Sequence, residues 1–361
     1  MGIRDGYGTT WPNNIYNDDI IWGALMAIRS FAIFNDGAMK DMAINNFNLV
    51  WNRGWDTALG GGIWWTTDKT SKNACVNAPA AICAMLIYYA TGDTSYRTKA
   101  RMIMNWMKSR LYDANTGEVK GAINAAGVIT EGSRTYTQGC FIGAASELQK
   151  YFASENWIAL AVKATDYAKN VMSNAQGLLP DEYCGSDDCP GFKSIFARWV
   201  CKFVKDQNRV SSYGAWLDYN AKEAWRYRNS KGLMWAQWWR RTPDGFLTSW
   251  ETASGVSMMN CVFLYRTGNT VSREATEELS ADNERINVFS VFPTRTSSLL
   301  TIETSPSFQR GPFQITAADG TPVRTIKDHH NPIDISNLAN GLYFISIQQG
   351  GGKVVKKFIK E

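Results

Sequence analysis

Histidine is scarce in this 361-residue sequence. Only two histidines occur, His329 and His330, and both lie near the C-terminus. The long helical part of the chain therefore has no histidine that could act as a general base, activate a nucleophile or bind zinc. Proton transfer in that part falls to carboxylates, lysine, tyrosine or cysteine.

Long apolar runs, basic runs and an export signal are also lacking. We find no run of about 18 apolar residues, so we expect no membrane-spanning segment. The first six residues do not resemble a signal peptide. The net charge of +5 is modest, and no Lys/Arg run stands beside aromatic residues, so we expect no nucleic-acid partner.

Cysteine occurs seven times, an odd number that leaves at least one thiol free or bonded to another chain. Cys184 and Cys189 flank a four-residue loop, where a disulfide is one of two open alternatives outside the cytoplasm. Several of the others lie on apolar helical faces, where we expect them to be small core residues.

Aromatic residues, by contrast, are abundant, with 15 Trp, 15 Tyr and 16 Phe. Their ordinary use is core packing. The alternative is a cleft in which sugar rings stack on aromatic faces, and the sequence features described next bear on that choice.

Two adjacent carboxylates, Asp18 and Asp19, open an apolar helical pattern that runs until Asp36. We predict Asn17 as the helix cap, which puts both aspartates in the first turn, where the helix dipole favours negative charge. A capped helix start needs no enzyme to explain it. However, adjacent helical residues point about 100° apart, so both carboxylates cannot cap the helix. Two carboxylates that point in different directions suit the two sides of one glycosidic bond.

Five helical segments open with polar or aromatic residues at intervals of roughly 55 to 64 residues. The openings are Asn17-Asp18-Asp19, Lys72-Asn73, Tyr136-Thr137-Gln138-Gly139, Phe192-Lys193 and Ser249-Trp250-Glu251. A second helix follows each of the first four, so each interval is one helical hairpin, and stacked hairpins form a solenoid or a closed ring. The first helices would all begin on one face, where we expect the chemistry. A ring of six hairpins is the familiar closed form, so we predict a barrel that lacks its N-terminal hairpin.

From residue 287 onward the pattern changes to short β-like runs separated by turn signals such as Asp319-Gly320 and Asn340-Gly341. We predict a helical domain at 1–270, a polar linker at 271–286 and a small antiparallel β-sandwich at 287–361.

The motifs of the helical part, taken in order, extend over nearly all of residues 12–268. They are Asn17-Asp18-Asp19 with Trp22-Gly23, Gly60-Gly61-Gly62-Ile63-Trp64-Trp65, Lys72-Asn73 with Asn77, Tyr136-Thr137-Gln138-Gly139, Phe192-Lys193-Ser194-Ile195-Phe196-Ala197-Arg198, and Trp250-Glu251-Thr252. Each motif alone is weak, but their order and spacing resemble glycoside hydrolase family 76, the α-1,6-mannanases.

This resemblance implies an all-α (α/α)6 toroid and retaining endo-hydrolysis of α-1,6-linked mannan, with no metal and no other cofactor. It implies that Asp18 is the nucleophile, which forms a glycosyl-enzyme, and that Asp19 is the acid/base. We expect the pKa of Asp19 to be raised, because burial beside Trp22 and a negative neighbour both favour the neutral acid.

Nine residues are candidates for substrate binding: Asn17, Trp22, Trp64, Trp65, Asn73, Asn77, Tyr136, Gln138 and Trp250. Glycines 60–62 permit close backbone approach, so the two tryptophans after them would form a sugar platform. The alternative of a core tryptophan weighs more for Trp65 than for Trp64. The amide side chains would bond sugar hydroxyls or cap helices.

One departure from the family pattern concerns position 121. We expect relatives to carry an aspartate after the Thr116-Gly117 turn, and this chain has Gly121 in its place. The departure leaves the exact glycan open.

The C-terminal motifs are Val291-Phe292-Pro293, Ile315 with Asp319-Gly320, Ile333-Asp334-Ile335-Ser336-Asn337-Leu338 and Gly341-Leu342-Tyr343-Phe344. They resemble the sorting domain of the type IX secretion system. The resemblance implies a protein that is secreted or attached to the cell surface, with the secretion machinery as a partner. Such proteins carry an N-terminal export signal, so we expect that the natural protein extends before this sequence. We also expect a monomer.

Two other functions fit parts of the sequence. A catalytically inactive barrel that binds mannan would show saturable binding without release of reducing ends. An Asp-Asp helix start with aromatic walls also suits Mg²⁺-dependent isoprenoid chemistry, although no second acidic cluster with ligand spacing is evident.

Overall fold

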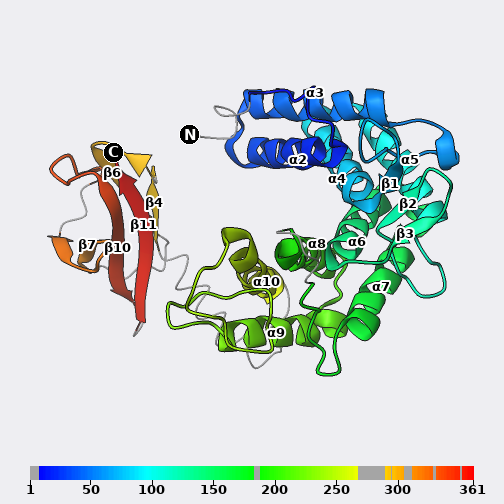
Figure 1. Cartoon of the computed structure of the whole chain (residues 1–361). Coiled ribbons are helices and arrows are strands. Elements are labelled where there is room, and N and C mark those ends of the chain that lie inside the picture. The colour runs from blue at the N-terminus through cyan, green and yellow to red at the C-terminus, as the bar shows by residue number, and fades with distance from the viewer. Residues whose placement is uncertain are drawn as a thin grey trace. The chain divides into compact units, whose positions relative to one another are not determined.

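A computed structural model describes residues 8–182, 188–266, 289–293, 295–304, 311–327, 331–349 and 352–361 (Figure 1). The chain divides into two compact units, Met1–Thr270 and Val271–Glu361. The predicted linker at 271–286 lies outside the described residues.

Within the described part of the first unit, five helices follow one another in a curved inner row (Figure 1). They are α2 (Asn17–Phe34), α4 (Ala74–Thr91), α6 (Thr135–Gln149), α8 (Phe192–Asp206) and α10 (Ser249–Arg266). Outer helices pack on this row, namely α3 (Gly37–Gly54), α5 (Thr94–Arg110), α7 (Trp157–Tyr167) and α9 (Val210–Arg226). The alternation of inner and outer helices agrees with the predicted series of hairpins.

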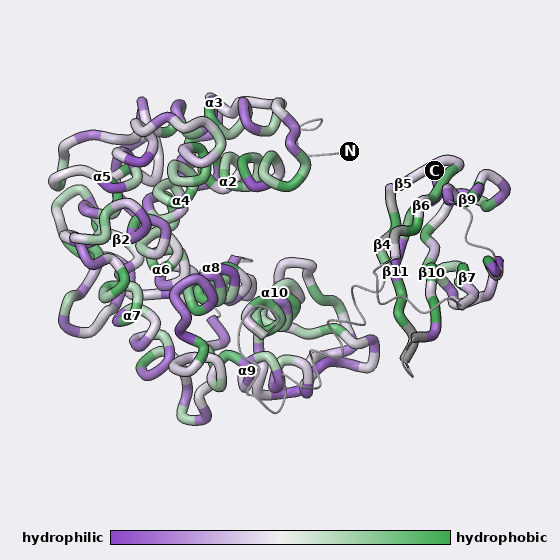
Figure 2. Tube along the Cα trace, turned by 180° about the vertical axis from the view of Figure 1, so that it is seen from behind, coloured by the Kyte–Doolittle hydropathy of each residue, from purple (hydrophilic) through white to green (hydrophobic). Residues whose placement is uncertain are grey.

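The inner and outer helices differ in composition, which explains their positions. Helix α4 is alanine-rich, and from Ala74 to Met85 every residue except the half-buried Cys75 is buried. Outer helices such as α5 carry hydrophilic stretches between the hydrophobic ones (Figure 2). The sequence expectation of no long apolar run was wrong for α4. Its 18 residues have a mean hydropathy of 1.5, enough by length and composition to cross a membrane, but 67% of them are buried inside this unit.

The helix starts also differ between the rows. Asp36 and Asp93 cap the outer helices α3 and α5 by accepting from the backbone N–H groups of Ala38 and Ser95. The predicted cap of α2 was wrong, because Tyr16 is the N-cap and its side chain makes no capping bond. Asn17 is the first helical residue and is fully buried.

A small antiparallel sheet stands beside the starts of α4 and α6. Its strands are β1 (Ser71–Asn73), β2 (Ala122–Asn124) and β3 (Ile129–Glu131), in that order. The sheet connects loops that are far apart in sequence, since Lys72 pairs with Ile123 and Ala122 pairs with Glu131.

One disulfide joins two inner helices. Cys201 of α8 and Cys261 of α10 are bonded, with their Cα atoms 5.4 Å apart. Both residues lie in the hydrophobic core, as expected of small core residues, and so do Cys83 and Cys140, which are free. The predicted Cys184–Cys189 bridge stays a prediction, because Cys184 lies outside the described residues.

The second unit is rich in β-structure. Its strands are β4 (Phe289–Phe292), β5 (Arg295–Thr296), β6 (Leu299–Thr304), β7 (Phe313–Ala317), β8 (Pro322–Ile326), β9 (Ile333–Asp334), β10 (Gly341–Gln349) and β11 (Gly352–Lys360). They form one sheet in the order β5-β11-β10-β7-β8 and another in the order β4-β6-β9. Side chains from both sheets share one core, which includes Phe289, Leu300, Ile315, Ile345 and Phe358.

Candidate active site

The two aspartates at the start of α2 line a cavity of about 590 Å³. Residues from the starts of α2, α4, α6, α8 and α10 contribute to its wall, so the predicted gathering of chemistry at one face is observed. Seven of the eleven predicted catalytic and binding residues line this cavity: Asp18, Asp19, Trp22, Trp65, Asn73, Tyr136 and Trp250.

Asp18 is the half-buried member of the pair. Burial raises its pKa, and the negative charge of Asp19 raises it further. The indole of Trp65 and the thiol of Cys75 lie close enough to oppose this rise in part. Neither gives a well-formed hydrogen bond to the inner oxygen, since Oδ1 of Asp18 and Nε1 of Trp65 are both buried without a partner.

Asp19 is exposed, and its Oδ2 accepts a hydrogen bond of 3.1 Å from Nδ2 of Asn14. It also borders a neighbouring cavity of about 630 Å³, which it shares with Trp11 and Trp22. The two carboxylates therefore have different surroundings, as the helical geometry predicts. Of the two carboxyl groups, the half-buried Asp18 is the one whose pKa burial raises.

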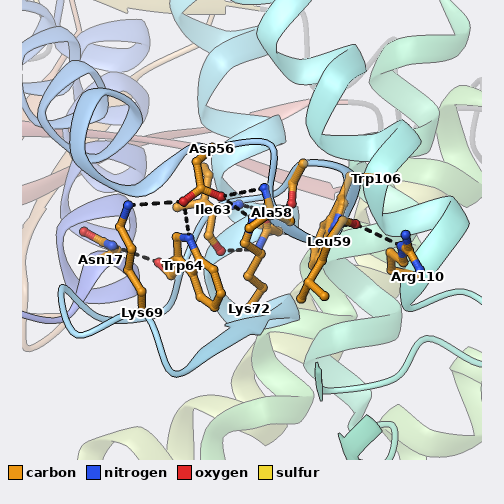
Figure 3. A network of polar contacts seen from close by, with 12 residues as sticks. Asn17, Asp56, Ala58, Leu59, Ile63, Trp64, Lys69, Lys72, Trp106 and Arg110 are labelled. Carbon is orange, nitrogen blue, oxygen red and sulfur yellow. Dashed lines mark hydrogen bonds and ion pairs between the residues drawn. The ribbon is translucent and has the colours of Figure 1, made fainter. Parts of the chain in front are cut away.

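A network around Asp56 fixes the loop that carries Trp65 (Figure 3). Asp56 accepts hydrogen bonds from Nζ of Lys72 at 2.9 Å, Nε1 of Trp64 at 2.6 Å and Nζ of Lys69 at 3.1 Å. Burial alone would raise the pKa of Asp56, but these bonds hold it below its usual range. Lys72 is fully buried and donates to the carbonyl oxygens of Ala58 and Gly61 as well.

Asn17 fastens this loop to the first turn of α2. Its Nδ2 donates to the carbonyl oxygen of Trp64 at 2.8 Å, and its backbone N–H donates to that of Trp65 at 2.8 Å. Its Oδ1 accepts from Nε of Arg53 at 2.7 Å. With all of these groups engaged inside the protein, Asn17 does not line the cavity; it places Trp65 beside Asp18.

Trp64 also differs from its predicted role. It is only 5% exposed, it donates to Asp56, and Nζ of Lys72 lies 4.5 Å from its ring. Trp64 is therefore a buried part of the loop network, and Trp65 is the tryptophan that faces the cavity. The sequence analysis favoured Trp64 over Trp65 as the residue that faces the sugar, and this order was wrong. Adjacent residues in an extended loop point to opposite sides, so when one tryptophan faces the cavity the other faces the interior.

Two further predicted binding residues, Asn77 and Gln138, are fully buried and outside the cavity. Oδ1 of Asn77 accepts from the backbone N–H of Ile63 at 2.8 Å. Oε1 of Gln138 accepts from that of Val119 at 2.7 Å. Their role is to hold loops against α4 and α6, in agreement with the ordinary need of buried polar groups for partners.

Aromatic residues from the starts of α6, α8 and α10 also line the cavity. The rings of Tyr136 and Phe192 lie 4.3 Å apart, and burial raises the pKa of Tyr136 well above its usual value, so its hydroxyl stays neutral. Nε1 of Trp250 donates to the carbonyl oxygen of Asp188 at 2.7 Å. The ring of Trp250 covers Gly191, where any Cβ would come within 1.9 Å of it.

Four cavity residues with ionisable side chains were not predicted as site residues: Cys75, Glu131, Asp188 and Arg198. Arg198 belongs to a recognised motif but is not among the predicted site residues. Within the described residues it has no ion pair. Glu131 comes from a hairpin without any recognisable motif, so no sequence signal marks it. Among the described residues, no group of three or more His, Cys, Asp or Glu side chains is placed to hold a metal ion.

Comparisons with known proteins agree with this geometry. A family model described as Glycosyl hydrolase family 76 matches residues 4–275, and one described as Secretion system C-terminal sorting domain matches residues 290–361. No curated protein matches the chain.

Several solved structures are similar. The α-1,6-mannanase from Salegentibacter sp. HEL1_6 has a TM-score of 0.66 at 27% identity, over 73% of this chain and 79% of its own. A complex of that enzyme with α-1,6-mannotetraose has a TM-score of 0.65 at 26% identity, with coverage of 73% and 79%; it contains an inactive variant in which two consecutive aspartates are replaced by alanine. A family 76 mannosidase from Bacteroides thetaiotaomicron, at 18% identity and a TM-score of 0.61 over 70% of this chain and 72% of its own, shares the fold.

Proposed function

The chain belongs to glycoside hydrolase family 76, and from this premise we propose that it is a retaining endo-α-1,6-mannanase whose catalytic residues are Asp18 and Asp19. One observation carries the proposal: adjacent carboxylates with different surroundings line one aromatic-walled cavity. The inactive variant of the Salegentibacter enzyme, which lacks two consecutive aspartates, supports the same pair of roles here.

The different surroundings of the two carboxylates support separate roles in a two-step mechanism. Asp18, held at the start of α2, would attack the anomeric carbon as a carboxylate. As the glycosidic bond breaks, Asp19 would give its proton to the leaving oxygen. The result is a mannosyl ester of Asp18 and a shortened chain.

In the second step a water molecule would attack the anomeric carbon, and Asp19 would take its proton while the ester bond to Asp18 breaks. Both carboxyl groups then return to their starting protonation states. The exposed position of Asp19 suits this role, because the acid/base must meet both the leaving group and the incoming water.

The C-terminal unit is a type IX sorting domain, so the protein is exported to the cell surface or the extracellular space. We propose that the substrate is extracellular α-mannan. We also propose that the curved row of helices is part of an (α/α)6 toroid, that residues 287–361 form a β-sandwich after a linker, and that the protein works as a monomer. Sedimentation analysis would test the last point.

The test of function is a product assay. Purified protein is incubated with linear α-1,6-mannan, and released oligosaccharides are separated by chromatography. We expect a series of oligomannosides from the wild type and none from Asp18→Asn or Asp19→Asn, with all three proteins giving the same circular dichroism spectrum. Saturable mannan binding without any released product would instead indicate an inactive binding protein.

A further inference from the structure

Glu131 places a third carboxylate in the catalytic cavity. It is the last residue of β3 and it is exposed. Within the described residues, its side chain has no hydrogen bond and no ion pair. A carboxylate can only accept hydrogen bonds when ionised, so the ligand that it suits is one that donates them.

The backbone fixes where Glu131 stands. Its carbonyl oxygen accepts from the N–H of Gly121 at 2.9 Å, and the carbonyl oxygen of Gly121 accepts from the N–H of Ala74 at 2.7 Å. Ala74 is the first residue of α4 and precedes Cys75, which lies against Asp18. Two consecutive hydrogen bonds thus connect Glu131 to the start of an inner helix.

The carboxylate of Glu131 lies over Gly121. A Cβ at position 121 would stand 2.8 Å from Cβ of Glu131 and 2.9 Å from its Oε2. Gly121 is not among the glycines with positive φ, so its backbone conformation is open to other residues. The backbone carbonyl oxygen of Gly132 would also stand 2.8 Å from that Cβ, so position 121 needs glycine for space, and the side chain of Glu131 packs directly against it.

The charge of Glu131 also acts on two residues that feel the charge of Asp18. Burial raises the pKa of Tyr136 and of Cys75, and the charges of Glu131 and Asp18 raise both further. These two cavity residues are thus close to both carboxylates. Because both residues keep their protons, neither carries a charge that would neutralise Glu131.

We propose that Glu131 determines specificity in the proposed reaction by accepting hydrogen bonds from two neighbouring hydroxyl groups of the mannose unit bound beside Asp18. The inference rests on the proposed function. The two oxygens of a carboxylate match two adjacent hydroxyls, and charged acceptors make stronger hydrogen bonds than neutral ones. The same charge repels glycans that carry phosphate or uronic acid groups, so the preferred substrate is a neutral mannan.

The first experiment removes the carboxylate. We expect Glu131→Ala to lower kcat/KM on linear α-1,6-mannan by about 10- to 100-fold, the effect of losing a hydrogen bond to a charged group. Glu131→Gln should lose less, because an amide still offers one acceptor. Glu223→Gln, on the outer helix α9, is the matched control and should act as wild type. Equal kcat/KM for Glu131→Ala and wild type would overturn the inference and leave the proposed function standing.

If the wild type releases no product, the same variants are compared for binding of α-1,6-mannotetraose by calorimetry, with Asp18 and Asp19 intact. Weaker binding by Glu131→Ala would support the role of Glu131 although the hydrolase proposal had failed. Unchanged binding would overturn the inference.

Discussion

The chemistry of the site depends on the unequal surroundings of two neighbouring residues. Asp18 is half-buried with one oxygen unpartnered, whereas Asp19 is exposed and held by Asn14. Burial and the charge of Asp19 both favour the protonated form of Asp18. A nucleophile must be ionised to react, so this environment has a direct consequence for the pH dependence of the enzyme.

We expect activity to fall on acidification at a higher pH than an ordinary, solvent-exposed aspartate would give, because the raised pKa of Asp18 sets the acidic limb. Asp19→Asn removes one cause of the rise, so its acidic limb should move to lower pH. The measurement is a pH profile of kcat/KM on an aryl α-mannoside. Its leaving group departs without being protonated, so the reaction does not need the acid that Asp19→Asn removes. An unmoved limb in Asp19→Asn would contradict this assignment.

At the scale of elements, loops fastened to helix starts build the site. The loop that carries Trp65 is held from one side by Lys72 and from the other by Asn17 (Figure 3). Lys72 is fully buried, so its charge is satisfied inside the protein, by Asp56, two carbonyl groups and the ring of Trp64. The loop geometry therefore depends on one buried cation.

Replacing Lys72 by methionine should destabilise the helical unit by about 1–3 kcal/mol, because the carbonyl oxygens of Ala58 and Gly61 lose their charged donor, while Asp56 is 31% exposed and keeps its other partners. It should also reduce activity, because Trp65 loses its fixed position beside Asp18. Lys69→Met is the control: Lys69 contacts the same carboxylate, but its side chain is 45% exposed, so we expect about 0–1 kcal/mol. Denaturant unfolding of the two variants measures the difference, and similar losses would contradict the role given to Lys72.

The sequence predicted helices better than loops for a physical reason. Apolar periodicity marks α2 and α4 directly, and the aspartates follow because they open a helix. The roles of Asn17, Asn77 and Gln138 could not be predicted from the sequence. The same residue types serve as buried amides that hold a loop and as amides that bind a sugar. Glu131 was missed because a hairpin brings it beside Asp18 from more than 100 residues away.

At the scale of the whole molecule, the disulfide bond is consistent with the export of the protein. Cys201 and Cys261 bond two inner helices, and disulfides persist in oxidising compartments outside the cytoplasm. The bond closes a loop with a sequence separation of 60 residues. It connects α8 to α10, which carries Trp250 of the cavity wall.

We expect the double variant Cys201→Ala/Cys261→Ala to lose roughly 4 kcal/mol of unfolding free energy, the entropic value for a loop of this length. Reduction of the wild type should have a comparable effect. Thermal unfolding with and without reductant measures both, and Cys83→Ala serves as the control for loss of a free buried thiol. A double variant as stable as the wild type would show that the disulfide adds nothing.

The measurement that tests the central claim most directly is proton NMR of α-1,6-mannotetraose during hydrolysis, with the wild type and Asp18→Asn in parallel. A glycosyl ester on Asp18 requires two displacements at the anomeric carbon, so the first product should be the α-anomer, and Asp18→Asn should give no product. A β-anomer formed first, or hydrolysis by Asp18→Asn at the wild-type rate, would contradict the account.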